Sequence, residues 1–154
     1  MAMKERLQDY IDLNREIDYQ TSRLERFDDK MCSIGVPVYN DSPRNPSPDY
    51  DRLSNMVARK ESIENTIREL AQKRDTEREE LERLIARLEK PKFRMVLRLR
   101  YLDLEEWEDV HFIMFGDKDD YSENYDNYKQ NIFRWHRAAI KELDAIANSE
   151  EVTA

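Results

Sequence analysis

The sequence predicts an all-α protein, in which a long antiparallel helical hairpin of coiled-coil type precedes a small C-terminal helical module. Three observations lead to this fold class. The 154 residues include only two glycines, and the tight turns that join strands depend on glycine. Charged residues make up 39% of the chain and hydrophobic residues another 39%, a composition typical of long helices. Apolar side chains also recur with heptad spacing over much of residues 1–90.

The first helix is predicted over residues 3–34. Apolar side chains recur with heptad spacing from Met3 to Met31, which keeps one stripe facing a partner helix. The pattern ends at Gly35, a typical helix stop. Residues 35–49 hold four of the five prolines, so we expect a loop there.

The second helix is predicted over residues 50–90, where a new heptad pattern continues as far as Lys90 and Pro91. Two apolar stripes joined by one loop favour an antiparallel hairpin over residues 1–90. A register that places Met31 opposite Leu53 brings Arg6 close to Glu77, so polar interruptions on the two helices coincide.

Three apolar residues project beyond the start of the first helix in this register: Leu84, Ile85 and Leu88. They need a cover, which is either the C-terminal module or a second copy of the chain. An exposed strip of this kind usually marks an interface, so we expect a homodimer or a larger oligomer.

Pro91 begins the C-terminal module, predicted over residues 91–148. Its helices are expected from Phe93 to Tyr101, from Leu104 to Gly116 and from Asn127 to Ala147. The last of them carries apolar side chains at core spacing. Residues 149–154 are expected to be a disordered tail.

Cysteine content and hydropathy predict a cytoplasmic protein. The single cysteine, Cys32, cannot form a disulfide within the chain, which fits a reducing compartment. The first residues contain no apolar run of the kind found in signal peptides. No segment has the length of apolar sequence that a membrane span needs.

No pattern in the sequence predicts an enzyme, a cofactor or a metal site. Phosphate-binding glycine loops and the serine nucleophile motif are absent, and two glycines are too few to build one. His111 and His136 have no partner at metal-ligand spacing, and Cys32 has no motif histidine nearby.

Two segments of the module carry a resemblance. Residues 94–110 are RMVLRLRYLDLEEWEDV, and residues 132–140 are IFRWHRAAI, followed by Leu143. Together they resemble sigma-70 region 4-like helix-turn-helix modules, in which an apolar "LRY" helix and a "WEEI" scaffold helix precede a recognition helix with V-x-R-x-H-x-x-A-L. With the hairpin before it, the layout is similar to the small phage and prophage transcriptional regulators of the RinA/ArpU type.

The resemblance implies promoter contact through the last helix, because the second helix of such motifs enters the major groove. It implies a bacterial host and, as a partner, the host RNA polymerase. Arg94, Arg98 and Arg100 would add basic charge nearby. The implied DNA-binding residues, of which the last four share one helix face, are Asn127, Lys129, Gln130, Arg134, Arg137 and Lys141.

The module departs from that family in charge and in its turn. His111 stands where the family has a small residue, and residues 116–127 replace a tight turn. Residues 103–126 hold ten acidic residues and one basic, and the net charge of the chain is −8, which opposes DNA binding. The alternative is an acidic phage-borne interaction protein, an inhibitor or anti-repressor, that binds a basic host protein and mimics nucleic acid. Its docking surface would comprise Glu105, Glu106, Asp109, Asp117, Asp119 and Asp120.

Overall fold

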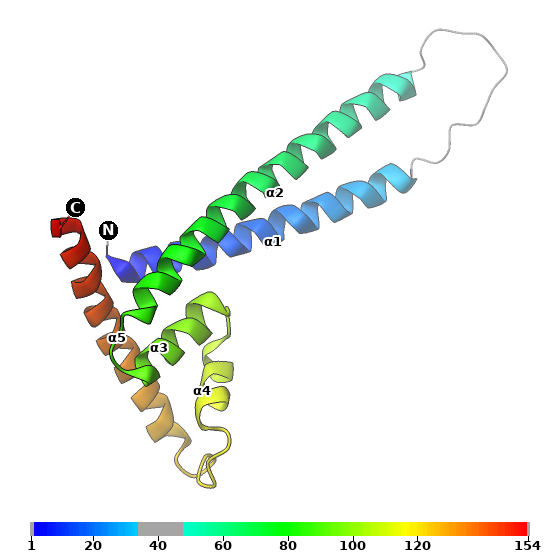
Figure 1. Cartoon of the computed structure of the whole chain (residues 1–154). Helices are drawn as coiled ribbons and strands as arrows, with labels where there is room; N and C mark the ends of the chain where they lie inside the picture. Colours follow the sequence, from blue (N-terminus) through cyan, green and yellow to red (C-terminus); the bar gives the residue numbers. More distant parts are fainter. Residues whose placement is uncertain (1, 34–47, 154) are drawn as a thin grey trace. The chain divides into compact units, whose positions relative to one another are not determined.

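The computed structural model describes residues 2–33 and 48–153, and all regular secondary structure in these ranges is helical (Figure 1). The all-α prediction is therefore confirmed. No helix among the described residues combines the length and the apolar composition needed to cross a membrane. The elements in chain order are α1 (Met3–Ser33), α2 (Pro48–Ala86), α3 (Pro91–Leu97), the π-helical turn η1 (Arg98–Leu102), α4 (Trp107–Phe115) and α5 (Tyr125–Thr153).

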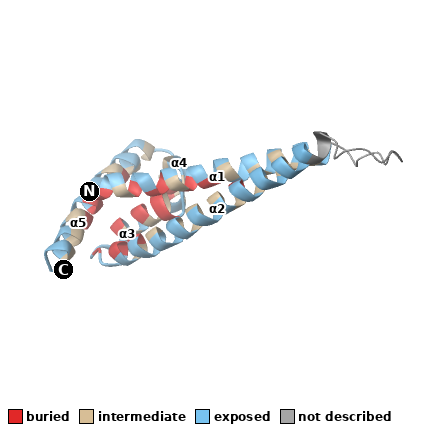
Figure 2. Cartoon of the chain, turned by 90° about the horizontal axis from the view of Figure 1, so that it is seen from above, coloured by how far each residue is buried: buried red, intermediate tan, exposed pale blue. Residues whose placement is uncertain are grey.

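The chain divides into two compact units, and the division differs from the one predicted at residue 90. The first unit combines residues 1–12 with residues 75–154, and the second comprises residues 13–74. The start of α1 and the end of α2 thus belong to the same unit as α3, α4 and α5. Buried residues concentrate in this first unit (Figure 2).

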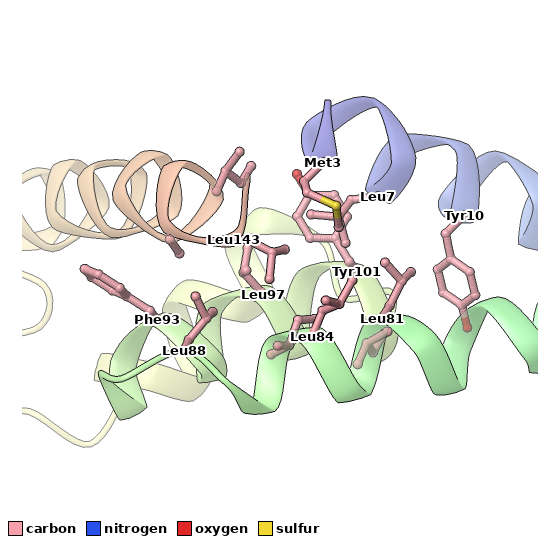
Figure 3. Close-up of a cluster of buried hydrophobic side chains, with 14 of the residues drawn as sticks. Met3, Leu7, Tyr10, Leu81, Leu84, Leu88, Phe93, Leu97, Tyr101 and Leu143 are labelled. Carbon is pink, nitrogen blue, oxygen red and sulfur yellow. The ribbon is translucent and has the colours of Figure 1, made fainter. Parts of the chain in front are cut away.

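The main core of the first unit joins both ends of the chain (Figure 3). Its side chains come from α1, from the last turns of α2 and from the C-terminal helices. The backbone N–H of Met3 donates to the Asp144 carboxylate at 2.7 Å, and Arg6 pairs with Glu77 at 2.5 Å. The Arg6–Glu77 proximity predicted from the heptads is confirmed. The labelled core residues are Met3, Leu7, Tyr10, Leu81, Leu84, Leu88, Phe93, Leu97, Tyr101 and Leu143.

The strip that was expected to overhang α1 is covered within the chain. Leu84, Ile85 and Leu88 are all buried, packed with α1 and with the C-terminal helices. Of the two covers considered, the C-terminal module is the one that the structure shows. The strip therefore supplies no argument for an oligomer.

Helix α2 ends at Ala86 and not at residue 90 as predicted. A proline disfavours helical backbone in the residue before it, and Lys90 is accordingly extended. The Arg94 guanidinium donates to the carbonyl oxygens of Leu88 and Glu89, at 2.5 and 3.1 Å. These bonds satisfy carbonyl groups of the link between α2 and α3.

A second, smaller core lies between α3, α4 and α5. Its buried members are Val96, Val110, Phe115 and Ile132. The π-helical turn η1, which follows α3, contributes side chains to both cores. Tyr101 and Leu102 lie in the main core, and Leu99 packs on the second.

Helix α5 is longer than predicted at both ends. It begins at Tyr125 and continues to Thr153, so residues 149–153 are helical and the expected disordered tail is wrong for them. These last turns carry an ion-pair cluster: Glu150 accepts hydrogen bonds from Arg83 of α2, at 2.8 and 3.0 Å, and from Arg87, which follows α2.

The second unit is a pair of antiparallel helical segments from α1 and α2. Asp28, late in α1, pairs with Lys60, early in α2, at 2.9 Å. Among its described residues the buried apolar side chains are Ile17 and Ile63, while Tyr19, Leu53 and Val57 are exposed. Of the predicted loop, residues 35–47 lie outside the described residues, and residues 48 and 49 begin α2.

Candidate nucleic-acid interface

The predicted DNA-binding residues lie on the solvent-facing side of α5. All six are exposed: Asn127, Lys129, Gln130, Arg134, Arg137 and Lys141. The buried side of the same helix carries Ile132, His136, Ala139, Ile140 and Leu143. Residues 127–141 contain four basic residues and no acidic residue, so this stretch is locally positive in an acidic chain.

The arginines of α3 and η1 bind groups of their own chain. Arg98 bonds the Glu82 carboxylate at 2.8 Å, and Arg94 bonds backbone carbonyl groups. Arg100 donates to the Glu105 carbonyl oxygen at 3.0 Å and lies 5.1 Å from the centre of the Trp107 ring. The sequence-based expectation that these three arginines extend the basic surface is therefore wrong.

The outward face of α5 has no such internal partners. Within the described part of the chain, Gln130, Arg134, Arg137 and Lys141 form no hydrogen bond or ion pair. We define these four residues as the α5 face. Their charged and polar groups are free to bind an external partner.

Two histidine contacts fix the opposite side of α5. The Tyr101 hydroxyl and His136 Nε2 are hydrogen-bonded at 2.7 Å, and the Trp107 ring meets the His136 ring edge-on at 4.9 Å. Burial, with smaller contributions from Lys4, Arg100 and Arg137, lowers the pKa of His136 to about 4. His136 is therefore a neutral core residue, and the described residues contain no His, Cys, Asp and Glu grouping suited to a metal.

An aromatic cluster and one carboxylate hold the segment between α4 and α5. Phe115 stacks on Tyr128 with ring centres 4.5 Å apart. Asp120 accepts hydrogen bonds from the Tyr128 hydroxyl at 2.5 Å and from the Asn124 amide at 2.7 Å, and these bonds lower the pKa of Asp120. Asp120 therefore positions the start of α5, which corrects its assignment to a free docking surface.

The rest of the predicted acidic surface divides by exposure. Glu106, Asp109, Asp117 and Asp119 are exposed, whereas Glu105 is half-buried. Glu106 also lies 3.6 Å from Arg100. On α4, among these carboxylates, Phe112 and Ile113 are 63% and 51% exposed. Sequence analysis missed this apolar pair, although both residues fall outside the buried stripe set by Val110.

A small pocket in the first unit was also missed. Its volume is about 270 Å³, and His111 forms part of its wall. Burial and the nearby Lys129 lower the pKa of His111, so its ring is neutral. The only sequence signal was the presence of His111 where the resembling family has a small residue. The other lining residues are Trp107, Glu108, Tyr125, Lys129, Ile132 and Phe133.

The second unit holds a larger groove between its two helical segments, with a volume of about 810 Å³. Basic side chains outnumber acidic ones along it, since Arg23, Lys30, Arg52 and Arg59 face a single carboxylate, Asp51. Sequence analysis did not single out these residues.

Comparison with known proteins places the chain in a family. The model of a family described as a protein of unknown function (DUF1492) matches residues 48–144, which is more than half of the chain. The chain therefore belongs to this family. No curated protein and no solved structure matches it.

Proposed function

We propose that this member of the DUF1492 family is a phage-derived transcriptional regulator that binds promoter DNA through the α5 face, alone or with host RNA polymerase. The observation that carries the proposal is the contrast between the arginines of the first unit. Arg94, Arg98 and Arg100 bind groups of their own chain, whereas Arg134 and Arg137 have no hydrogen-bond or ion-pair partner among the described residues. Free basic and amide side chains in a row on one exposed helix are suited to phosphates and base edges.

The net charge of −8 does not oppose this role locally. At physiological ionic strength the Debye length is about 8 Å, so distant carboxylates are largely screened while the α5 face retains its positive potential. The acidic residues near α4 restrict the orientation in which a duplex can approach. Such an arrangement favours specific over non-specific binding, because the protein has little general attraction for phosphate.

The hairpin supplies the arm of the regulator, for dimerisation or for contact with polymerase. Tyr19, Leu53 and Val57 are exposed in the second unit and offer apolar contact area. Analytical ultracentrifugation of the protein, alone and with host polymerase, distinguishes the two uses.

The first prediction concerns base contact by Arg134. Replacing Arg134 with Ala should weaken binding to the preferred sequence by about 1–3 kcal/mol and relax the preference at one base pair. Replacing Arg137 or Lys141 should weaken binding to all sequences alike. Each replacement should also reduce the slope of log binding constant against log salt concentration by about one. Gel shifts against phage genomic fragments at low salt, with and without host polymerase, measure both effects.

Arg26→Ala is the matched control, because Arg26 is an exposed arginine of the second unit. It should leave DNA binding unchanged. If no fragment is shifted in either lane, the regulator proposal is wrong.

A second candidate function is favoured by the exposed Phe112 and Ile113 among the carboxylates of α4. An acidic surface with apolar anchors is suited to a basic protein partner, as an inhibitor or anti-repressor would require. Replacing Asp109, Asp117 and Asp119 with Lys should then abolish capture of that partner, while Arg134→Ala leaves it intact. Asp120 is left unchanged in this test because it holds the start of α5.

A further inference from the structure

The groove of the second unit is lined by one stripe of each of its two helical segments. Arg23, Phe27 and Lys30 lie four and three residues apart on α1, and the lining residues of α2 continue from Asp51 to Thr66. At about 1.5 Å per residue, that stretch of α2 is roughly 22 Å long. The groove is therefore elongated, and its length suits about four turns of a bound helix.

The floor of the groove is apolar and incompletely covered. Phe27 and Met56 fall on the heptad seams of the two helices but are only half-buried, whereas Ile63 is 7% exposed. Leu53, one turn before Met56, is 42% exposed. Seam residues of paired helices normally bury against the facing helix. Within the described part of the chain, these seam residues remain partly open to solvent.

Four basic side chains flank this floor in two rows. Arg23 and Lys30 are seven residues apart on α1, and Arg52 and Arg59 are seven residues apart on α2. Seven residues of α-helix rise about 10.5 Å, so both rows have the same spacing. All four side chains are exposed, and none has a hydrogen-bond or ion-pair partner among the described residues. Asp51 is the one carboxylate in the lining, so the groove is positive.

An amphipathic helix with acidic flanks matches both the floor and the rows. Helices dock in such grooves through apolar side chains at positions i, i+3, i+4 and i+7. In a helical bundle the flanking e and g positions recur every seven residues and carry the charges that select the partner. Carboxylates at that spacing would therefore fall opposite both residues of each basic row. A nucleic-acid strand would engage the basic rows alone and leave the apolar floor uncovered.

We propose that the groove binds an amphipathic helix of another protein, with an apolar stripe between two rows of Asp or Glu at seven-residue spacing. The acidic helix α4 of a second copy fits less well, because its nine residues span about 13.5 Å against the 22 Å of the groove. The inference specifies the contact that the hairpin arm makes. It concerns the second unit alone and does not depend on DNA binding by the α5 face.

The test uses the full-length chain and a synthetic helix of three heptads, with leucine at a and d and glutamate at e and g. The glutamates also keep the peptide from pairing with itself. Cys32, the single cysteine, is exposed and lies two residues beyond Lys30, so a dye attached to it reports on the groove. The peptide should change the dye signal in a saturable way, and binding should weaken as salt is raised. A peptide with lysine at e and g should bind about tenfold more weakly.

Replacing Arg52 and Arg59 together with Glu should weaken binding of the acidic peptide about tenfold and allow the lysine peptide to bind instead. This exchange of preference requires an intact groove, so loss of folding cannot produce it. Arg26→Glu combined with Lys73→Glu is the matched control, because it changes the net charge equally. Both control residues are exposed, lie on the same two helices and do not line the groove. The control should bind the acidic peptide as the unmodified chain does.

A preference for the acidic peptide that reverses with the charges of the groove supports the inference. If neither peptide changes the signal, or if a scrambled acidic peptide of the same composition binds equally well, the inference is wrong. It is also wrong if an oligonucleotide binds the groove and the acidic peptide does not. Sedimentation that shows self-association lost on replacing Arg52 and Arg59 would make the groove an interface between copies and overturn it. Gel shifts with Arg134→Ala, run in parallel, report on the proposed function separately.

Discussion

At the scale of single residues, the two histidines of the first unit are both buried but differ in their hydrogen bonding. Within the part of the chain that the structure describes, His136 has a hydrogen-bond partner, whereas His111 has none. Their positions in the sequence do not reveal this difference, because each depends on side chains brought together by folding. The α5 face, in contrast, follows directly from the 3.6-residue period of one helix, and its exposure was predictable.

The buried His136 predicts a pH-dependent stability. Above pH 6.5 the imidazole is neutral in both the folded and the unfolded chain, so it adds no pH dependence. As the pH falls from 6.5 toward 4, only the unfolded chain takes up the proton, and the free energy of unfolding decreases. The loss should amount to about 2–3 kcal/mol across this window.

Urea unfolding at pH 7.5, 5.5 and 4.5 measures this effect, with His136→Gln as the comparison. His111 titrates in the same direction because burial also lowers its pKa. The reference protein and the His136→Gln variant should therefore both carry His111→Phe, which removes the contribution of His111. Equal pH slopes for the two would show that His136 does not cause the effect.

At the scale of elements, the end of α5 depends on a contact with α2. Glu150 accepts from Arg83 and Arg87, and these bonds lower the pKa of Glu150 to about 2. The carboxylate therefore stays charged, and the contact should persist until the pH falls well below 4.5.

Glu150→Ala should release the last turns of α5, so their backbone amides should exchange with solvent faster. Glu151→Ala is the matched control, because Glu151 is exposed and the contact with the arginines is formed by Glu150. Hydrogen exchange read by NMR provides the measurement. Equal protection in both variants would mean that helix propensity alone holds the end of α5.

The helices themselves could be predicted from the sequence, and their ends could not. Heptad spacing and few glycines were sufficient to identify α1 and α2, and Pro91 marked the break before α3, which was expected to begin at Phe93. The end of α2 lies four residues earlier than predicted, and Lys90 is already extended before Pro91. The prediction was also wrong at the end of α5, where Glu150 pairs with Arg83 through a contact that forms only on folding. Asp120 was misassigned for the same reason: its hydrogen bond to Tyr128 spans a segment that composition describes only as acidic.

At the scale of the whole molecule, the first twelve residues complete a core whose other members lie after residue 74. Met3, Leu7, Tyr10 and Ile11 are all buried there. The family match begins at residue 48, so these residues lie outside it. The fold of the first unit therefore needs more chain than the part that matches the family.

A chain that begins at residue 13 should lose cooperative unfolding in the first unit. Burying one large apolar side chain contributes about 1.5–3 kcal/mol, so four of them approach the whole stability of a typical domain. Thermal unfolding followed by circular dichroism measures the loss. Gln8→Ala, at an exposed position of the same segment, is the control and should leave the melting curve unchanged. An unchanged melting curve for the shortened chain would contradict this account.

The hydrogen bond from Met3 to Asp144 joins positions 141 residues apart, which has a consequence for biosynthesis. A ribosome adds about 5–20 residues per second, so Asp144 is made roughly seven to thirty seconds after Met3. During that interval the apolar side chains at the start of α1 remain uncovered on the nascent chain. They are then accessible to chaperones, and neighbouring chains on the same messenger RNA can exchange these segments before each completes its own core.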